Sequence, residues 1–492
     1  MIRAFNMVTK EDIKTALPST CSVVVPDLER EVNEVVDRWS EAGISHPYAI
    51  VTPNTEDDII ATIQYARRNG LKIVPVNGGH GAFVPINRKT IYLDMKIFKD
   101  VVLDEEKEEV RIGGGCVAGD VLGALTERGW YTLTPNSNPV GMIGAILGGG
   151  SGSLNALHGF TIDHVKSITI IPFSSPSAEH SSSLRSIMLT PSSRGEEKSL
   201  FNVLCGAGHG LGIITSLTLR AWKIQSLNLT HNSIWTRRLL FPASEIPTAA
   251  QLYTSLLPPP PALSPVLAFL RAPPSAPNPG LPLIMLALSY FGPAADAEKA
   301  VKCTYGEVEN KATSVFTTLT PWSNMNAAAV PLNVHGGFKE YHGCLVKEVD
   351  GSSVEDSFEK WKEFTEDVQG RGRSYVVIGS WDTERLEGNA GEEDEKFFSP
   401  RGNGVFVQCT PWYVDLEGKG WADGFGKAVV ECMRCRDTKE GRRRWAFANN
   451  VAAGQDMREV YSEEQLEKIR RVKQVWDRGN VGWSPVMDGW EE

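Results

Sequence analysis

Hydrophobic and polar residues alternate along the first half of the chain in short runs that predict strands and helices in turn. Residues 47–53 form an apolar run typical of a strand. A helix is predicted from Glu56, because apolar residues return every third or fourth position from Ile59 to Ala66 and Gly70 ends the pattern. Further strand-like runs lie at residues 71–76, 90–93, 110–112, 168–172 and 212–220, and a second helical pattern lies at residues 117–127.

The second half of the chain mixes the two patterns differently. Strand-like runs lie at residues 283–290, 375–378 and 404–409, and helical runs lie at residues 294–302 and 354–368. This mixture predicts an α+β unit with an antiparallel sheet. Residues 257–282 contain ten prolines. Because proline cannot build helix interiors or central strands, we expect an exposed loop there.

Composition adds limits to this picture. The chain has 492 residues and a formal net charge of −10, which argues against a nucleic-acid partner or an anionic membrane surface. It contains no apolar run of about 18 residues, so no membrane span is expected. No secretory signal is visible, which favours a cytoplasmic location and leaves secretion open. The oligomeric state is not indicated by the sequence.

Cysteine usage gives no sign of a metal. Eight cysteines in 492 residues are too few for a disulfide scaffold. Cys432 and Cys435 form a C-x-x-C pair, but neither a second pair nor a histidine pair accompanies it. We therefore expect no zinc site, and a reducing environment is the default.

The distribution of glycine is the main functional signal. Four clusters lie within about 140 residues, at residues 78–81, 113–115, 141–152 and 206–212. Glycine lets a backbone approach a ligand closely, and successive N–H groups can hold phosphate oxygens. Any single cluster is explained by a tight turn, whereas the four together predict a large phosphate-bearing ligand.

The common nucleotide-binding motifs do not explain these clusters. A nicotinamide site of the Rossmann type needs G-x-G-x-x-G between a strand and a helix. Residues 148–152 lack this spacing, and residues 206–212 precede a predicted strand. The Gly-Lys-Ser/Thr end of a P-loop is also missing.

One ordered set of motifs resembles a known family. Residues 76–81, Val-Asn-Gly-Gly-His-Gly, resemble the R-G-G-G-H-S signature of the FAD-linked oxidases related to vanillyl-alcohol oxidase and p-cresol methylhydroxylase. Six further motifs follow the family order within residues 45–222. Residues 398–402 and 447–450 resemble the F-P-H-R-x-G and Y-x-N-Y motifs of the berberine-bridge-enzyme-like oxidases. The resemblance is weakest over residues 226–395.

This resemblance implies an α+β fold made of two domains. The expected FAD-binding domain is the two-part p-cresol methylhydroxylase (PCMH) type, over residues 1–225 with its core at about 45–222. The expected substrate domain, over residues 226–425, has an antiparallel sheet with helices. Residues 426–492 are expected to return to the FAD-binding domain.

The resemblance also implies how FAD is held. His80 occupies the position of the histidine that is often bonded to the flavin, so covalent attachment through His80 is expected. Ser137 occupies the position of the cysteine that makes a second bond in many relatives, and serine cannot form that thioether. The other implied flavin or phosphate contacts are Asn77, Gly78, Gly79, Gly81, Ser137, Val140, Gly141, Gly144, Gly148, Gly149, Gly150, Ser151, His158, Ile214 and Asn449.

The catalytic base is less well indicated. In related enzymes it is a tyrosine or glutamate on the substrate-domain sheet, and no glutamate aligns here. Gln408 matches a position that often faces the substrate. The other candidates are Tyr375, Asp382 and Tyr413, for which ordinary packing roles are the alternative.

The implied activity is oxidation of an alcohol or amine C–H by hydride transfer to the flavin, with dioxygen as acceptor and hydrogen peroxide as product. The implied substrate is a small, secondary-metabolite-like organic molecule. A carbohydrate substrate is one alternative. Others are cyclisation or isomerisation with little net oxidation, and FAD binding without turnover.

Overall fold

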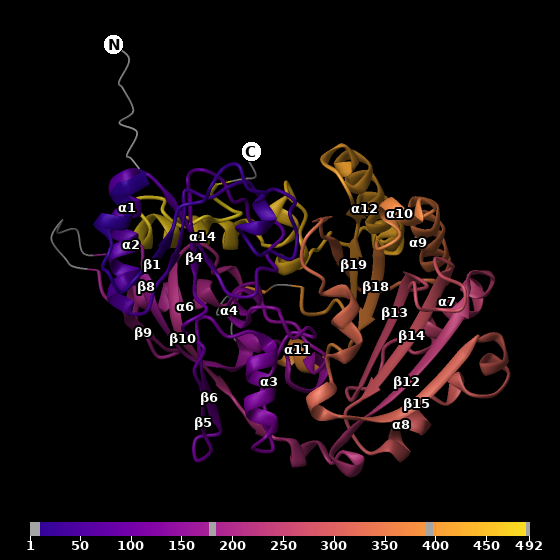
Figure 1. The fold of residues 1–492 in the computed structure, drawn as a ribbon. Coiled ribbons are helices and arrows are strands. Elements are labelled where there is room, and N and C mark those ends of the chain that lie inside the picture. The colour runs from indigo at the N-terminus through magenta and orange to yellow at the C-terminus, as the bar shows by residue number, and fades with distance from the viewer. Residues whose placement is uncertain (1–9, 177–183, 390–396, 399, 489–492) are drawn as a thin grey trace.

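The computed structural model describes residues 10–176, 184–389, 397–398 and 400–488. Two units lie side by side in Figure 1: the indigo and magenta FAD unit, and a sheet unit coloured from magenta to orange. Helices combine with parallel and antiparallel sheets in this chain, so the predicted α+β class is confirmed. Within the described residues, no helix is long and apolar enough to cross a membrane.

The first layer of the FAD unit is a four-stranded sheet in the order β1-β2-β4-β3. Strands β2, β4 and β3 are parallel. Helix α2 connects β2 to β3, and its start is fixed by a capping box between Thr55 and Asp58. The elements are α1 (Lys10–Ala16), β1 (Ser22–Val24), β2 (Ala49–Thr52), α2 (Glu56–Asn69), β3 (Lys72–Val76) and β4 (Thr90–Asp94).

The second layer is a five-stranded antiparallel sheet in the order β5-β6-β10-β8-β9. Its strands are β5 (Val101–Asp104), β6 (Glu109–Gly113), β8 (Val165–Pro172), β9 (Ile187–Leu189) and β10 (Gly212–Arg220). The helices of this part are α3 (Ala118–Thr126), α4 (Met142–Leu147), α5 (Asn155–His158) and α6 (Gly195–Ala207). The short strands β7 (Trp130–Tyr131) and β11 (Trp222–Lys223) pair beside them.

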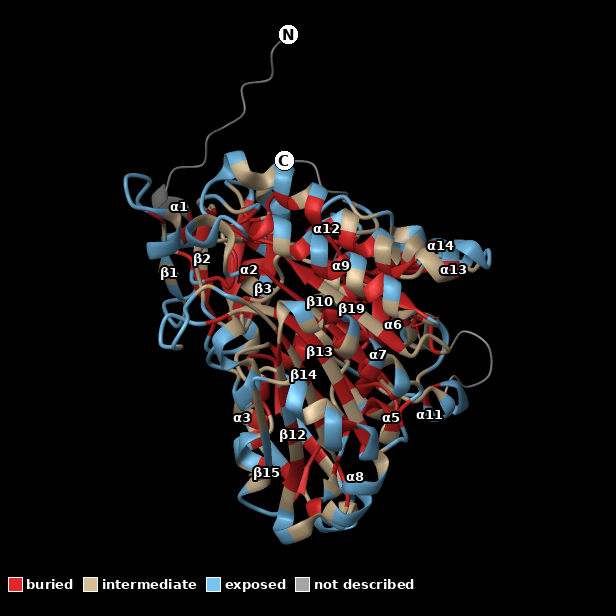
Figure 2. Cartoon of the chain, turned by 90° about the vertical axis from the view of Figure 1, so that its right-hand side faces the viewer, coloured by how far each residue is buried: buried red, intermediate tan, exposed pale blue. Residues whose placement is uncertain are grey.

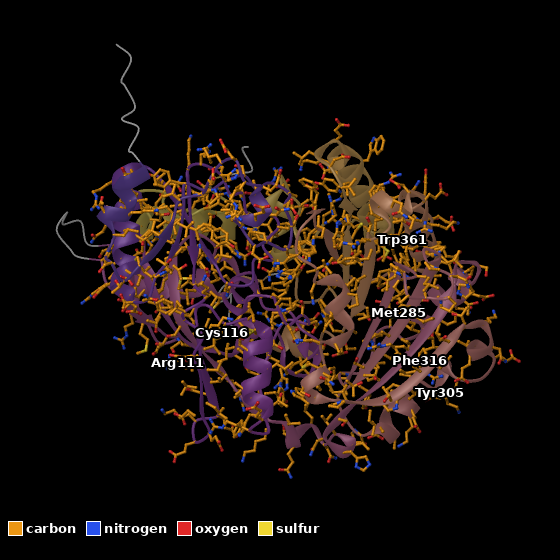
Figure 3. All side chains as sticks on the ribbon, in the orientation of Figure 1. Arg111, Cys116, Met285, Tyr305, Phe316 and Trp361 are labelled. Atoms are coloured by element: carbon orange, nitrogen blue, oxygen red, sulfur yellow. The ribbon has the colours of Figure 1, made fainter. Side chains whose placement is uncertain are left out.

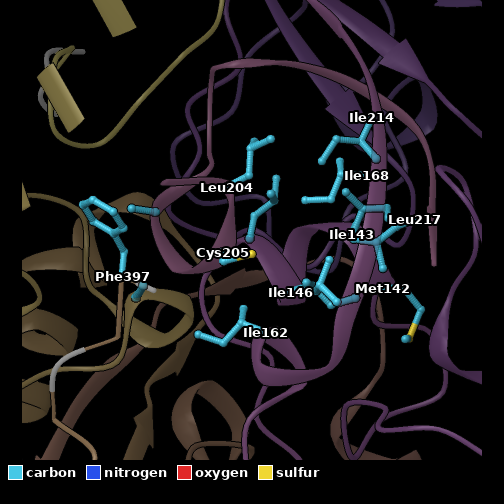
Figure 4. Packing of buried hydrophobic residues seen from close by; sticks show 14 of the residues in the cluster. Met142, Ile143, Ile146, Ile162, Ile168, Leu204, Cys205, Ile214, Leu217 and Phe397 are labelled. Atoms are coloured by element: carbon cyan, nitrogen blue, oxygen red, sulfur yellow. The ribbon is translucent and has the colours of Figure 1, made fainter. Parts of the chain in front are cut away.

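One hydrophobic core joins α4, α6 and β10. Figure 4 shows Ile146 of α4, Leu204 of α6 and Leu217 of β10 packed together. Phe397, which follows the sheet-unit helix α11, enters the same core, and its backbone N–H donates to the Cys205 carbonyl at 2.9 Å. The two units therefore share part of one core.

The sheet unit is built on a seven-stranded antiparallel sheet in the order β15-β12-β14-β13-β18-β19-β17. Its strands are β12 (Ser233–Pro242), β13 (Leu263–Arg271), β14 (Pro282–Tyr290), β15 (Ser314–Pro321), β17 (His342–Val346), β18 (Tyr375–Ser380) and β19 (Val405–Thr410). The pair β16 (Phe338–Lys339) and β20 (Trp412–Tyr413) lies beside it.

Helices cover one face of this sheet. They include α7 (Ile246–Ser255), α9 (Gly351–Phe364) and α12 (Lys419–Met433), with the shorter α8 (Ala294–Ala300), α10 (Val368–Arg371), α11 (Glu384–Gly388) and α13 (Cys435–Lys439) nearby. Figure 2 shows exposed residues on the outer sides of α9 and α12, with buried strands behind them. Trp361 of α9, labelled in Figure 3, is fully buried against the sheet, whereas Phe316 on the edge strand β15 is exposed.

The predicted proline-rich loop is wrong over part of its length. Strand β13 lies within residues 257–282 and sits between β14 and β18. Pro265 is tolerated because the ladder from β13 to β18 covers only Val266–Phe269, so this proline lies beyond that ladder. The remaining prolines stand before and after the strand.

The expected boundary at residue 425 also needs correction. Phe425 lies inside α12, and this helix packs on α9 of the sheet unit. The chain returns to the FAD unit only later, where α14 (Glu463–Trp476) packs on α6. In Figure 1 the yellow α14 lies on the side of the FAD unit.

Candidate active site

A cavity of about 400 Å³ lies between the glycine-rich loops of the FAD unit and the seven-stranded sheet. This is within the usual size range of ligand pockets. A smaller cavity of about 90 Å³ shares wall residues with it and extends between β3 and β10. Eleven predicted cofactor contacts line these two cavities: Asn77, Gly79, His80, Gly81, Ser137, Val140, Gly141, Gly144, Ser151, Ile214 and Asn449.

Gly78 does not line the cavity, but it lets two wall loops meet. A Cβ atom at Gly78 would lie 2.0 Å from the carbonyl oxygen of Pro139. No side chain fits at such a distance, so the loop of residues 78–81 packs backbone to backbone on the loop of residues 137–141. The glycine at this position builds the wall rather than touching the ligand.

Residues 148–150 also lie behind the cavity wall, where the C-terminal part of the chain meets α4. A Cβ atom at Gly148 would lie 2.1 Å from Oδ1 of Asn449. The Asn449 amide donates to the carbonyl oxygen of Ala145 at 2.8 Å. Gly148 therefore admits Asn449 to the wall, and the predicted direct contacts of residues 148–150 are absent from the lining.

His158 lies outside both cavities. Its ring stacks on Trp222 with centroids 4.3 Å apart, and its Nε2 is 3.0 Å from the Tyr131 hydroxyl. Burial lowers the pKa of His158 to about 3. Its role in this structure is packing, so the predicted flavin contact is not supported.

His80 presents a free nitrogen in a buried position. Its Nδ1 donates to the Gly78 carbonyl oxygen at 2.8 Å, because that oxygen can only accept. Its Nε2 is buried and has no hydrogen-bond partner. Burial lowers the pKa of His80 to about 4, and the nearby cations Lys339 and Arg38 add to this effect. The imidazole is therefore neutral at pH 7, with a lone pair on Nε2.

Two buried cations flank this region, and no sequence pattern distinguished either of them. Arg38 donates to the carbonyl oxygen of Gly81, and burial lowers its pKa. The Lys339 ammonium lies 4.5 Å from the ring centroid of Trp39 and 4.1 Å from that of Trp412. Burial lowers the pKa of Lys339 to about 7. Arg38 and Trp39 line the cavity itself.

The sheet unit contributes a polar network to the opposite wall. The Asn450 amide donates to Oε1 of Gln408 at 2.8 Å, and Nε2 of Gln408 lies 3.4 Å from the Tyr375 hydroxyl and 3.1 Å from that of Thr410. Tyr375, Gln408 and Asn450 all line the cavity. Burial raises the pKa of Tyr375 to about 12.

Tyr341 is a wall residue that the sequence did not indicate. It lies one position before β17 and stacks on Trp39 with centroids 4.7 Å apart. Burial raises the pKa of Tyr341 well above its ordinary value, and the neighbouring Tyr375 adds to this effect. The cavity thus carries two tyrosines as candidate proton acceptors.

Two of the predicted catalytic residues do not reach the cavity. Asp382 accepts the backbone N–H of Glu384 at 3.0 Å and belongs to the start of α11. The buried Tyr413 donates its hydroxyl hydrogen to Glu340 at 3.3 Å. The described cavity lining contains no aspartate or glutamate, so its candidate bases are tyrosines and histidines.

Comparison with known proteins agrees with this geometry. Residues 47–172 match the family model of an FAD binding domain. The chain is 29% identical to the FAD-linked oxidoreductase azaG of Aspergillus niger over 65% of this chain and 61% of azaG. It is 25% identical to the FAD-linked oxidoreductase hasG of Aspergillus fumigatus over 95% of this chain and 97% of hasG.

Solved structures share the fold at low sequence identity. BBE-like 1 of Physcomitrella patens aligns with a TM-score of 0.75 and 15% identity, over 99% of this chain and 100% of that chain. The glucooligosaccharide oxidase of Acremonium strictum aligns with a TM-score of 0.71 and 18% identity, over 95% of this chain and 96% of that chain.

The fold, the cavity and the matched domain lead to the same assignment. The loops of residues 77–81 and 137–144 lie within the matched FAD-binding segment and form one wall of the cavity. The chain therefore carries an FAD-binding domain, is similar over nearly its whole length to an FAD-linked oxidoreductase, and has the fold of the berberine-bridge-enzyme-like proteins.

Proposed function

We propose that this enzyme oxidises an alcohol or amine C–H of a small organic molecule, using dioxygen as the electron acceptor and releasing hydrogen peroxide. One observation carries the proposal. A single cavity brings the free Nε2 of His80, on the FAD unit, opposite the Tyr375 and Gln408 side chains of the sheet unit. This arrangement supplies a place for the cofactor on one side and proton-accepting groups on the other.

The residues of the FAD-side wall fit a bound FAD. The unpaired Nε2 of His80 is the atom that would carry a covalent bond to the flavin, and it is not otherwise used. Ser137 donates its hydroxyl hydrogen to Oδ1 of Asn333 at 2.6 Å, so it joins the two units and offers no thiol. When bound, FAD supplies the hydride-accepting chemistry that no protein side chain can supply.

The sheet-side residues would handle the proton of the substrate. Tyr375 is held by Gln408, which is itself oriented by Asn450. In its phenolate form, a tyrosine fixed in this way can accept a hydroxyl or amine proton as the C–H bond is broken. The stacked rings of Tyr341 and Trp39 add an aromatic surface to the cavity lining.

The lining favours a mainly apolar substrate over a sugar. Beside its polar network, the sheet side presents an aliphatic and aromatic surface formed by Val266, Leu332, Val377, Trp381, Phe406 and Phe447. A carbohydrate would need hydrogen-bond partners for many hydroxyl groups, which these residues do not provide. We therefore place an aromatic or terpenoid-like secondary metabolite ahead of a carbohydrate.

The first experiment tests the cofactor and its attachment. The purified enzyme is precipitated with acid, and the yellow colour is followed in pellet and supernatant. We expect the colour to stay in the pellet for the wild type and for the surface control His231→Asn, and to be released from His80→Ala. Release of the colour from the wild type would refute covalent attachment. Failure of the protein to take up FAD would refute the assignment as a whole.

The second experiment tests the reaction. Alcohols and amines of low polarity are screened with an oxygen electrode, and hydrogen peroxide is quantified for each. We expect equal molar oxygen consumption and peroxide formation with at least one aromatic substrate, and a weaker response with oligosaccharides. A product of unchanged mass formed without oxygen uptake would instead establish cyclisation or isomerisation.

A further inference from the structure

A buried cluster in the sheet unit brings three ligand-type side chains together. Glu340, His342 and Asp423 each offer one ligand atom, and these atoms lie within 4.8 Å of one another. His342 is the first residue of β17, Glu340 lies between β16 and β17, and Asp423 lies on α12. None of the three lines the active-site cavity, so the cluster is separate from the proposed reaction.

Two atoms of this cluster are buried without a hydrogen-bond partner. They are Nε2 of His342 and Oε2 of Glu340, and the side chains that carry them are 4% and 8% exposed. Such unpaired polar atoms are costly in a protein interior unless a ligand satisfies them. Both atoms point to the same place, because each lies within ion-pair distance of the other at 3.8 Å.

The spacing suits a small metal ion. Nε2 of His342 lies 3.4 Å from Oδ1 of Asp423. Ligand atoms at about 2.0–2.1 Å from a tetrahedral zinc ion lie roughly 3.3–3.4 Å apart. A histidine nitrogen with two carboxylates selects zinc and similar first-row ions over calcium, which takes about 6–8 oxygen ligands.

The surroundings hold the ligands in place. The Tyr413 hydroxyl and the Lys419 ammonium both donate to Oε1 of Glu340, at 3.3 and 2.8 Å, which leaves Oε2 free to bind. A Cβ atom at Gly426 would lie 2.2 Å from Cδ2 of His342, so only glycine at this position of α12 leaves room for the imidazole. Outer partners that orient metal ligands in this way are typical of metal sites.

We propose that Glu340, His342 and Asp423 form a binding site for one divalent transition-metal ion of the zinc type, which links α12 to the edge strand β17. Asp423 is 32% exposed, so the ion enters from solvent and water completes its coordination. The two carboxylates and Lys419 leave one negative charge uncompensated. The competing state is a protonated His342 that compensates this charge, and it excludes metal binding through Nε2.

Zinc binding tests the site directly. The FAD-loaded enzyme without an affinity tag is dialysed against chelator and then titrated with zinc chloride by calorimetry at pH 7.5. We expect one ion per chain, and Asp423→Asn and His342→Gln each to weaken binding at least tenfold. The surface control His231→Asn should bind as the wild type does.

A second readout distinguishes loss of metal binding from misfolding of a variant. Cobalt(II) substituted at the site should give the intense visible bands of a four-coordinate ion, and these should be lost in Asp423→Asn while the flavin spectrum is unchanged. Because Asp423 is partly exposed and His342 is buried, the fold should tolerate a substitution at Asp423 better than one at His342. The proposal would be overturned, in favour of the protonated histidine, if the wild type fails to bind zinc. It would also be overturned if Asp423→Asn and His342→Gln bind zinc as tightly as the wild type does.

Discussion

Arg401 and Asp163 form a bidentate ion pair that is buried between the sheet unit and the FAD unit. The Arg401 Nη1 and Nη2 atoms lie 2.9 and 2.8 Å from the two carboxylate oxygens of Asp163. The two side chains are 6% and 2% exposed. The pair therefore fixes the two walls of the cavity relative to each other, because one partner belongs to each unit.

Breaking this pair should destabilise the enzyme strongly. In Arg401→Leu the Asp163 carboxylate would remain buried without its charge partner, which costs about 3–5 kcal/mol of unfolding free energy. Urea unfolding followed by tryptophan fluorescence measures the change. The control is Arg30→Leu, which breaks an exposed pair with Glu34 and should cost less than about 1 kcal/mol. If the two variants lose equal stability, the buried pair is not a structural link.

Gly78 should be essential for retaining FAD. A side chain in Gly78→Ala would collide with the Pro139 backbone and separate the two wall loops. We expect less than a tenth of the wild-type flavin content after purification. The matched control is Gly123→Ala on α3, where nothing lies within 4 Å of the new Cβ atom. Since alanine favours helices, this control should keep its flavin and gain about 0.5–1 kcal/mol of stability.

The pH dependence of turnover should report on Tyr375. Burial raises the pKa of Tyr375 to about 12, so its phenolate form becomes more populated throughout the alkaline range. If Tyr375 accepts the substrate proton, log kcat/KM should rise with a slope approaching one between about pH 7 and 10. Tyr375→Phe should lower kcat/KM by about 100-fold and flatten this profile. An unchanged slope in the variant would assign the base to another residue, with Tyr341 as the next to test.

Stability should fall in mild acid because of buried neutral histidines. Burial lowers the pKa of His158 to about 3 and that of His209 to about 4. Below the unfolded value of about 6.5, the unfolded chain binds protons that the folded chain excludes, so stability is lost as the pH falls from about 7 to 4. Thermal unfolding across this range should show a smaller decline in His158→Gln than in the wild type. The exposed control His231→Asn should follow the wild type.

Much of the FAD-side wall could be predicted from sequence, because it depends on local backbone geometry. The sequence shows an ordered pattern of glycines, such as Gly79 and Gly144, with His80 between glycines. This pattern can be identified without knowing the fold. The same pattern placed Gly78 and Gly148 in the site, although they act by letting other segments approach. A motif identifies a position near the ligand, but it does not distinguish contact from support.

The sheet-side wall was harder to predict, because it depends on strand register and on distant packing. Tyr375 and Gln408 were identified, while Tyr341 and Arg38 enter the wall from segments without a motif. Tyr413 follows β19 but lies on β20, where its hydroxyl faces Glu340 instead of the cavity. The strand β13 was missed because prolines such as Pro265 argue against a strand more strongly than the apolar residues argue for one. Only the position of the neighbouring strands shows that Pro265 lies outside the β13–β18 ladder.

The cavity draws its walls from almost the whole length of the chain, and this has a consequence for biosynthesis. Lys473 of α14 donates to the carbonyl oxygens of Gly210 and Gly482, and Trp483 lines the smaller cavity. The cofactor pocket is therefore incomplete until residues up to about 483 have left the ribosome. Flavin capture must follow translation of this segment, so a nascent chain stalled earlier in the sheet unit would be released without its cofactor.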